Sequence, residues 1–261
     1  MAIGRRTYGI FFNGIGLVLV SAGYLGAQGF GEGDMAMRNE GHAGVVYPES
    51  GSGMAVEIKG SLRFEPITML ADLYRKDIVF LMRHGPTDWS QMDARGVEPK
   101  DCERQRMMTP DGKEAMRQLG MHLAISEILP AEIRVSPWCR NADTFATLME
   151  GIRHFVPDYD QSVEVTEDYG LGLLLSLGGA ATVAPIRAAI DDWEKRGPTG
   201  PLLLITHYTN IEELTEFKVY EGEILVLDPA LDNRVLGYLR MDTASPDAIH
   251  FNLPEIDRNS D

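Results

Sequence analysis

Three clusters in the sequence place histidine or arginine directly after a short run of apolar residues. The clusters are Arg83-His84-Gly85, Ser136-Pro137-Trp138-Cys139-Arg140 and His207, and the runs before them are 78–82, 133–135 and 202–206. Each run has the length and composition of a buried β-strand. The sequence therefore predicts two arginines and two histidines at the ends of three strands.

These side chains suit phosphoryl transfer. A neutral imidazole is a covalent nucleophile when its second nitrogen is held, usually by a backbone carbonyl. We therefore expect His84 to attack phosphorus, with Gly85 allowing the backbone to close behind it. A guanidinium group grips two phosphoryl oxygens at once, so Arg83 and Arg140 are the candidate phosphate ligands, and His207 is a further donor.

Helical segments separate the apolar runs and must position these residues. Thr109-Pro110 is typical of a helix start, and apolar residues recur at helical spacing in 116–123, 142–149 and 186–193. This alternation predicts an α/β fold, a three-layer sandwich with helices on both faces of a mainly parallel sheet. Ligands bind beyond the carboxyl ends of strands in such folds, so the three clusters should meet in one pocket.

Three further local elements are expected. Leu62 to Arg75 has the pattern of a helix that packs before the first strand. Ser136 is the expected N-cap of the helix that carries Arg140. Glu223 to Leu227 and Val235 to Met241 are compatible with an antiparallel hairpin at the sheet edge.

Length and charge limit the classes of partner. The chain has 261 residues, of which 44% are hydrophobic, enough for one ordinary domain. Its formal net charge of −15 disfavours nucleic acid and anionic membrane surfaces as partners. The expected partner is a small phosphorylated substrate or a phosphoprotein, held by a local basic pocket.

The N-terminus has the pattern of an export signal. Arg5 and Arg6 precede an uncharged, largely apolar stretch from Thr7 to Gly31. We interpret 1–22 as a signal peptide or an uncleaved anchor, 23–60 as a flexible arm and 61–261 as the catalytic domain. A buried N-terminal helix is the alternative. Export would place the protein in the periplasm or otherwise outside the cytoplasm, with membrane contact only through an uncleaved segment.

With the three clusters quoted above, the sequence resembles the histidine phosphatase superfamily, the phosphoglycerate-mutase-like group. The stretch Asp101-Cys102-Glu103-Arg104-Gln105-Arg106 is similar to one in exported bacterial members. The resemblance implies a phosphomonoester hydrolase, similar to the histidine acid phosphatases, that forms a phosphohistidine on His84. It also implies phosphate binding by Arg83, Arg140 and His207, with no metal and no cofactor.

The general acid that protonates the leaving oxygen has no secure match. Glu167 and Asp168 lie in the interval where many members have it, and Asp88 and Glu212 lie near the histidine motifs. Such an acid needs a raised pKa. Two alternatives to an exported phosphatase therefore stay open, a phosphoryl-binding scaffold without turnover and an intracellular phosphomutase.

Cys102 and Cys139 are too few for a disulfide scaffold and lack zinc-site spacing. After export they could form one bridge, which would pin the loop before the Thr109 helix to the turn with Arg140. Two free thiols are the alternative. For Gln105 and Arg106, a solvated loop and a pocket contact are both compatible with the sequence.

Overall fold

A computed structural model describes residues 46–47, 56–176 and 179–251. The signal or anchor expected at 1–22 lies outside these residues, as does most of the arm expected at 23–60. No helix in the described part is both long and apolar enough to cross a membrane.

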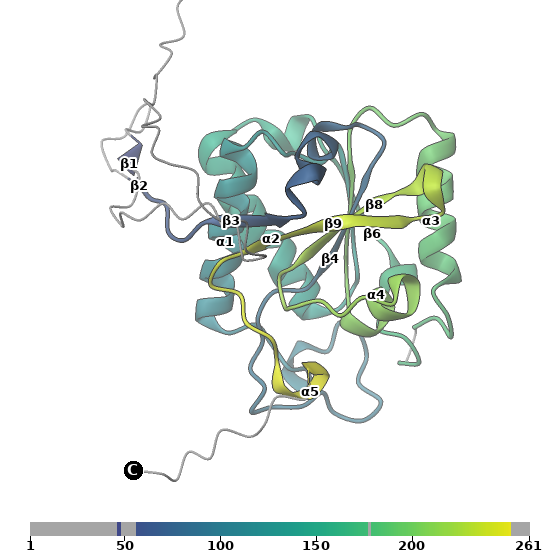
Figure 1. The fold of residues 1–261 in the computed structure, drawn as a ribbon. Helices are drawn as coiled ribbons and strands as arrows, with labels where there is room; N and C mark the ends of the chain where they lie inside the picture. The colour runs from purple at the N-terminus through teal and green to yellow at the C-terminus, as the bar shows by residue number, and fades with distance from the viewer. Residues whose placement is uncertain (1–45, 48–55, 177–178, 252–261) are drawn as a thin grey trace, which may run out of the picture. The chain divides into compact units, whose positions relative to one another are not determined.

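A seven-stranded sheet lies at the centre of the fold, in the order β3-β9-β8-β4-β7-β5-β6 (Figure 1). The strands are β3 Leu62–Glu65, β4 Val79–Arg83, β5 Glu132–Val135, β6 Glu164–Glu167, β7 Leu202–Thr206, β8 Ile224–Asp228 and β9 Arg234–Met241. Strands β4, β7, β5 and β6 pair in parallel, whereas β8, β9 and β3 pair antiparallel. The predicted α/β fold and the late antiparallel hairpin are confirmed. The hairpin does not lie at the sheet edge as expected, because β3 pairs with β9 and forms that edge, and only one half of the sheet is parallel.

Helices cover both faces of the sheet. Helices α1 (Pro110–Ile125) and α2 (Cys139–Phe155) lie on one face, and α3 (Ala184–Lys195) and α4 (Tyr208–Thr215) on the other (Figure 1). Alternate side chains of β4 enter different cores, since Phe80 and Met82 pack with α1 and α2 while Val79 and Leu81 pack with α3 and α4. The sheet is thus the middle layer of a sandwich.

Helices α1 and α2 pack closely because glycines face each other across their contact. A Cβ atom on Gly120 would overlap the carbonyl oxygen of Leu148, and one on Gly151 would overlap that of Arg117. Helix α1 begins as predicted, with the Thr109 hydroxyl accepting a hydrogen bond from Gly112 N at 2.9 Å. This packing fixes the position of α1, and the start of α1 lies beside the loop that follows β4.

The helix expected from Leu62 to Arg75 is wrong in its first part. Residues 62–65 form strand β3 on the edge of the sheet, paired with residues 238–241 of β9. Pro66 follows this strand, and Ile67–Tyr74 is a 3₁₀ helix that buries Met69 and Leu73. Pairing with a strand distant in sequence, and not the local spacing of apolar residues, decides the conformation of residues 62–65.

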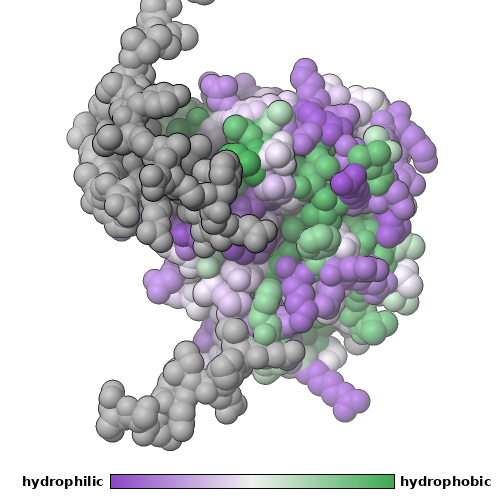
Figure 2. Space-filling view, viewed as in Figure 1, coloured by the Kyte–Doolittle hydropathy of each residue, from purple (hydrophilic) through white to green (hydrophobic). Residues whose placement is uncertain are grey.

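The end of the expected arm contacts the domain. Strands β1 (Val46–Tyr47) and β2 (Val56–Glu57) form a small antiparallel pair. Just after β2, Lys59 N donates a hydrogen bond to Gln118 Oε1 of α1 at 2.8 Å. Figure 2 shows hydrophilic residues spread over the described part of one face, with apolar surface between them.

Candidate active site

The ends of β4, β5 and β7 bring the predicted residues into one cleft. Arg83 ends β4, Arg140 lies in the first turn of α2, and His207 directly precedes α4. These three residues and His84 line an open cleft of about 230 Å³. All four are buried. The meeting of two arginines and two histidines at one sheet edge is therefore as predicted.

His84 is oriented by the backbone. Its Nδ1 lies 3.0 Å from the carbonyl oxygen of Gly85, so we place the ring proton on Nδ1, where it donates to that oxygen. This tautomer leaves the Nε2 lone pair free. The His84 and His207 rings are 5.7 Å apart between centroids, at 65°. The backbone thus holds the His84 imidazole, and the His207 imidazole lies beside it.

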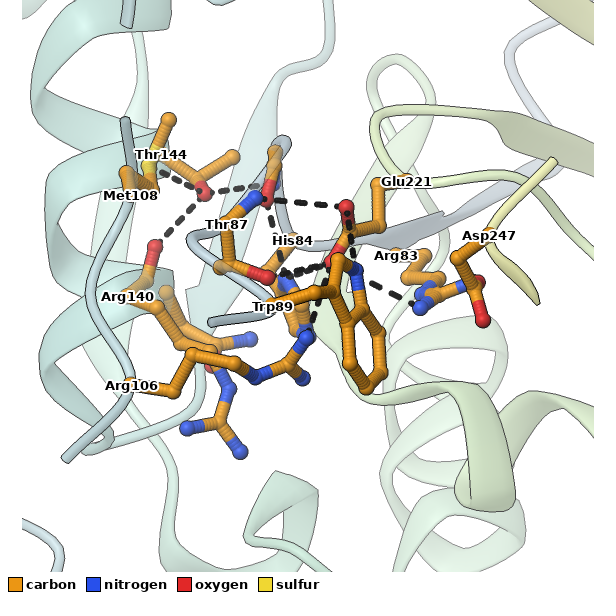
Figure 3. A network of polar contacts seen from close by, with 12 residues as sticks. Arg83, His84, Thr87, Trp89, Arg106, Met108, Arg140, Thr144, Glu221 and Asp247 are labelled. Atoms are coloured by element: carbon orange, nitrogen blue, oxygen red, sulfur yellow. Dashed lines mark hydrogen bonds and ion pairs between the residues drawn. The ribbon is translucent and has the colours of Figure 1, made fainter. Parts of the chain in front are cut away.

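Thr144 links Gly85 and Arg140 through hydrogen bonds. Gly85 N donates a hydrogen bond to Thr144 Oγ1 at 2.8 Å, and the same hydroxyl donates to the carbonyl oxygen of Arg140 at 2.6 Å (Figure 3). A Cβ atom at Gly85 would lie only 2.5 Å from Met116 Cγ. A larger residue behind His84 would therefore force the Met116 and Met108 side chains to move.

Ser136 has a different role from the one expected. It is not the N-cap of α2, because the helix begins at Cys139 and its N-cap is Trp138. The Ser136 hydroxyl instead lies 3.0 Å from His207 Nε2, and this hydrogen bond takes the side chain away from the helix. Arg140 still lies in the first turn of α2, where the helix dipole adds to the positive field.

Glu221 lies at the centre of the polar network, although it is not among the residues predicted from the sequence (Figure 3). It accepts hydrogen bonds from Thr87 Oγ1 at 2.5 Å and Trp89 Nε1 at 3.2 Å. Its Oε1 is 3.6 Å from Arg83 Nη2 and 3.4 Å from Arg106 Nη1. No local pattern in the sequence marks it as a site residue.

Two further carboxylates complete the charge balance. Asp93 Oδ1 is 3.0 Å from Arg140 Nη1 and accepts a hydrogen bond from Arg106 N at 2.8 Å. Asp247 Oδ2 is 2.8 Å from Arg83 Nη1. Three guanidinium groups in the cleft are thus matched by three carboxylates.

The loop before α1 is held against α2, which decides two questions that the sequence left open. Cys102 and Cys139 form a disulfide bond. Gln105 Oε1 accepts a hydrogen bond from Cys139 N at 3.1 Å, and Arg106 lines the cleft with its guanidinium 3.4 Å from the centre of the Trp89 ring. Both Gln105 and Arg106 are buried, so the expectation of a solvated loop is wrong for both residues. The expectation of a pocket contact is confirmed for Arg106.

The arginines and burial keep both histidines neutral. Burial, followed by the charges of Arg140 and Arg83, lowers the pKa of His84 well below its ordinary value. Burial and the same arginines, together with Arg106, do so for His207. Burial lowers the pKa of Arg106 to about 10, which leaves it charged at neutral pH. The cleft therefore combines cationic guanidinium groups with an unprotonated imidazole, as nucleophilic attack on a phosphoryl group requires.

The acids suggested by the sequence are not among the residues that line this cleft. Glu167 pairs with Lys100 at 2.7 Å, and Asp168 accepts a hydrogen bond from Gly170 N at 2.8 Å. Asp88 binds the Ser90 hydroxyl, and Glu212 accepts from the Tyr208 hydroxyl. Glu167 and Asp168 end up at the far side of β5, because β6 is the outermost strand of the parallel half.

Several residues of the cleft have buried nitrogen atoms without a partner in the described part of the chain. Arg83 Nε, Arg140 Nε and His207 Nδ1 are buried without a hydrogen-bond acceptor among the described residues. Such donors suit an anion. Within the described part of the chain, no group of three or more histidine, cysteine or acidic side chains is arranged to hold a metal ion.

Removing the disulfide should loosen the cleft as well as the fold. The bridge joins residues 37 positions apart, so we expect the Cys102→Ser/Cys139→Ser variant to lose about 3 kcal/mol of unfolding free energy. Its affinity for inorganic phosphate should also fall, because Arg140 follows Cys139. Urea denaturation and calorimetric titration measure both. Reductant should reproduce the effects in the wild type and change nothing in the double variant; unchanged phosphate affinity would contradict the coupling.

Glu221→Gln should destabilise the empty protein and make it more responsive to phosphate. The variant leaves Arg83 and Arg106 without a central negative charge, at a cost on the order of 3 kcal/mol. A bound anion replaces that charge, so saturating phosphate should raise the Tm of the variant more than that of the wild type. Exposed Glu150→Gln on α2 is the control. An equal phosphate-induced shift in all three proteins would argue against this role.

Both histidines should stay unprotonated as the pH falls through 6.5. The folded-state pKa of His84 and of His207 is below this ordinary value, so only the unfolded chain takes up these protons just below pH 6.5. Their contribution to stability is therefore fully present above pH 6.5 and is lost as the pH falls toward the folded-state values. NMR titration of the ring signals checks this, and midpoints at or above 6.5 would contradict it.

No family model matches this sequence, and no curated protein matches it. Solved structures do align with the chain. The structure of the protein histidine phosphatase SixA complexed with tungstate is 16% identical, with 63% of this chain and 96% of that chain covered and a TM-score of 0.44.

Two other structures give similar figures. The putative phosphohistidine phosphatase SixA from Agrobacterium tumefaciens is 13% identical over 66% of this chain and 99% of its own, with a TM-score of 0.43. The ecdysone phosphate phosphatase from Bombix mori, in complex with tungstate, is 15% identical over 58% of this chain and 89% of its own, with a TM-score of 0.42. The α/β fold gathers the motif arginines and histidines at one sheet edge.

Proposed function

We propose that this protein is a phosphomonoester hydrolase that acts through a phosphohistidine on His84. The proposal depends on one observation, namely that the backbone fixes the orientation of the His84 imidazole. His84 Nδ1 is bound to the Gly85 carbonyl oxygen, and its ring lies in a cleft with Arg83, Arg140 and His207. This arrangement leaves Nε2 as the nucleophilic atom.

In the first step, the Nε2 lone pair of His84 forms a bond to phosphorus while the bond from phosphorus to the leaving oxygen breaks. Negative charge spreads over the non-bridging oxygens at this point. Arg83 and Arg140 are fixed in advance by Asp247 and Asp93, so they stabilise that charge without having to reorganise. In the second step, water attacks phosphorus, the P–N bond breaks and phosphate is released.

His207 supplies a neutral hydrogen bond in both steps. Its Nε2 lies 3.0 Å from the Ser136 hydroxyl, and its Nδ1 is buried without a partner. With the ring proton on Nδ1, the Ser136 hydroxyl donates to Nε2 and the Nδ1–H donates to a phosphoryl oxygen. A neutral donor adds no charge to the three guanidinium groups already present.

An extracytoplasmic location is part of the proposal. The basic and then apolar N-terminal sequence has the pattern of an export signal. A disulfide bond beside the site is typical of proteins that work in an oxidising compartment. A small phosphorylated molecule or a phosphoprotein outside the cytoplasm is the expected substrate.

His84→Ala should abolish turnover. With the nucleophile removed, hydrolysis of an aryl phosphate should fall by at least about 10³-fold, and mass spectrometry of the quenched enzyme should no longer find a phosphoryl group on residue 84. Phosphate release, Tm and phosphate affinity of the variant are measured in parallel. Residual activity near the wild-type level would remove His84 as the nucleophile. Phosphate binding without turnover in the wild type would favour a scaffold.

A further inference from the structure

The cleft has an anion site but no evident proton donor for the leaving group. Asp93 is the only carboxylate among the described residues that line it. Its Oδ1 already receives hydrogen bonds from Arg140 Nη1 and Arg106 N. Asp93 is therefore already engaged as a partner of the two arginines.

The C-terminal part of the described chain brings a histidine to the same cleft. Helix α5 (Ala248–Phe251) carries His250, whose ring stacks on Tyr208 with 3.7 Å between centroids and an angle of 26°. The indole of Trp89 meets the same ring edge to face, with centroids 5.6 Å apart. His250 and both aromatic side chains line the cleft. The imidazole is thus held between two rings at the anion site.

Asp247 fixes the tautomer and the direction of this ring. Its Oδ1 lies 2.7 Å from His250 Nδ1 and also accepts a hydrogen bond from His250 N at 2.9 Å. A carboxylate this close places a proton on Nδ1. Nε2 is then the ring nitrogen available to a molecule bound in the cleft. Asp247 thus orients His250 in the way that a third group orients the general base of a nucleophilic site.

Resting on the phosphatase activity proposed above, we infer that His250 is the general acid and base of the reaction. In the first step, the protonated Nε2 of His250 gives its proton to the leaving oxygen as that oxygen departs from phosphorus. In the second step, the now neutral Nε2 takes a proton from the attacking water while the P–N bond to His84 breaks. The proton returns to His250, so each turnover is balanced.

The surrounding charges link proton uptake to substrate binding. Arg83 Nη2 lies 3.4 Å from His250 Nδ1, and Lys218 Nζ donates to the His250 carbonyl oxygen at 3.0 Å. In the empty cleft, burial and then Arg83 lower the pKa of His250, and Asp247 opposes them. A phosphoryl group bound to the arginines offsets their positive field, which favours the protonated ring. The acid is then formed where the substrate is bound.

A series of leaving groups tests the assignment. For kcat/KM, which covers only the steps up to loss of the leaving group, His250→Gln should cost about 100-fold with an unactivated alkyl phosphate. It should cost much less with a nitrophenyl phosphate, whose leaving group needs little protonation. His154→Gln, on the far end of α2, is the matched control and should behave as the wild type.

A second variant separates chemistry from folding. His250→Ala should regain part of its activity on alkyl phosphates when imidazole is added, whereas its affinity for inorganic phosphate should change little. An equal loss with every leaving group, or no loss, would overturn the role of His250. A leaving-group dependence that appears in Asp93→Asn instead would move the acid to Asp93. Lack of turnover by the wild type with all these esters would instead refute the phosphatase itself.

Discussion

Three guanidinium groups lie buried in one cleft, and each of them needs a negative partner inside the protein. Without compensation, neighbouring buried cations repel each other and lose their hydration, at a cost of several kcal/mol each. Glu221, Asp247 and Asp93 supply the compensation. Because these carboxylates occupy only part of the donor set of each arginine, nitrogens such as Arg140 Nε have no partner among the residues that the structure describes. The site is therefore stable when empty and still able to bind an anion.

The mixed sheet explains how the basic side chains and the carboxylates reach the same cleft. The parallel strands β4, β5 and β7 end at the same edge and deliver the arginines and histidines. Two of the carboxylates come with the antiparallel half, since Glu221 lies just before β8 and Asp247 follows β9. The segment after β9 also brings α5 and His250 to this edge (Figure 1). Because β8 runs opposite to β4, Glu221, which precedes β8, lies at the edge where β4 ends.

The elements that the sequence predicted well are those with strong local signals. The start of α1 follows from Thr109 and Pro110, and buried β4 from a continuous apolar run. Predictions failed where distant segments compete with local preference. Residues 62–65 look helical by spacing but pair with β9, whose partner residues lie at 238–241. Ser136 has a side chain that suits an N-cap, but its hydroxyl forms a hydrogen bond with His207 Nε2 instead.

The sequence by itself identified the basic side chains that gather in the cleft: His84, Arg83, Arg140 and His207 follow strand-like runs, and their types predict phosphoryl chemistry. Only the tertiary structure decided which acidic side chains face them. The chain has 39 aspartate and glutamate residues, and nothing local distinguishes Glu221 or Asp247 from the rest. Their partner Arg83 lies 138 and 164 positions away. Compensation of buried charge depends on distances in space, which a sequence pattern does not contain.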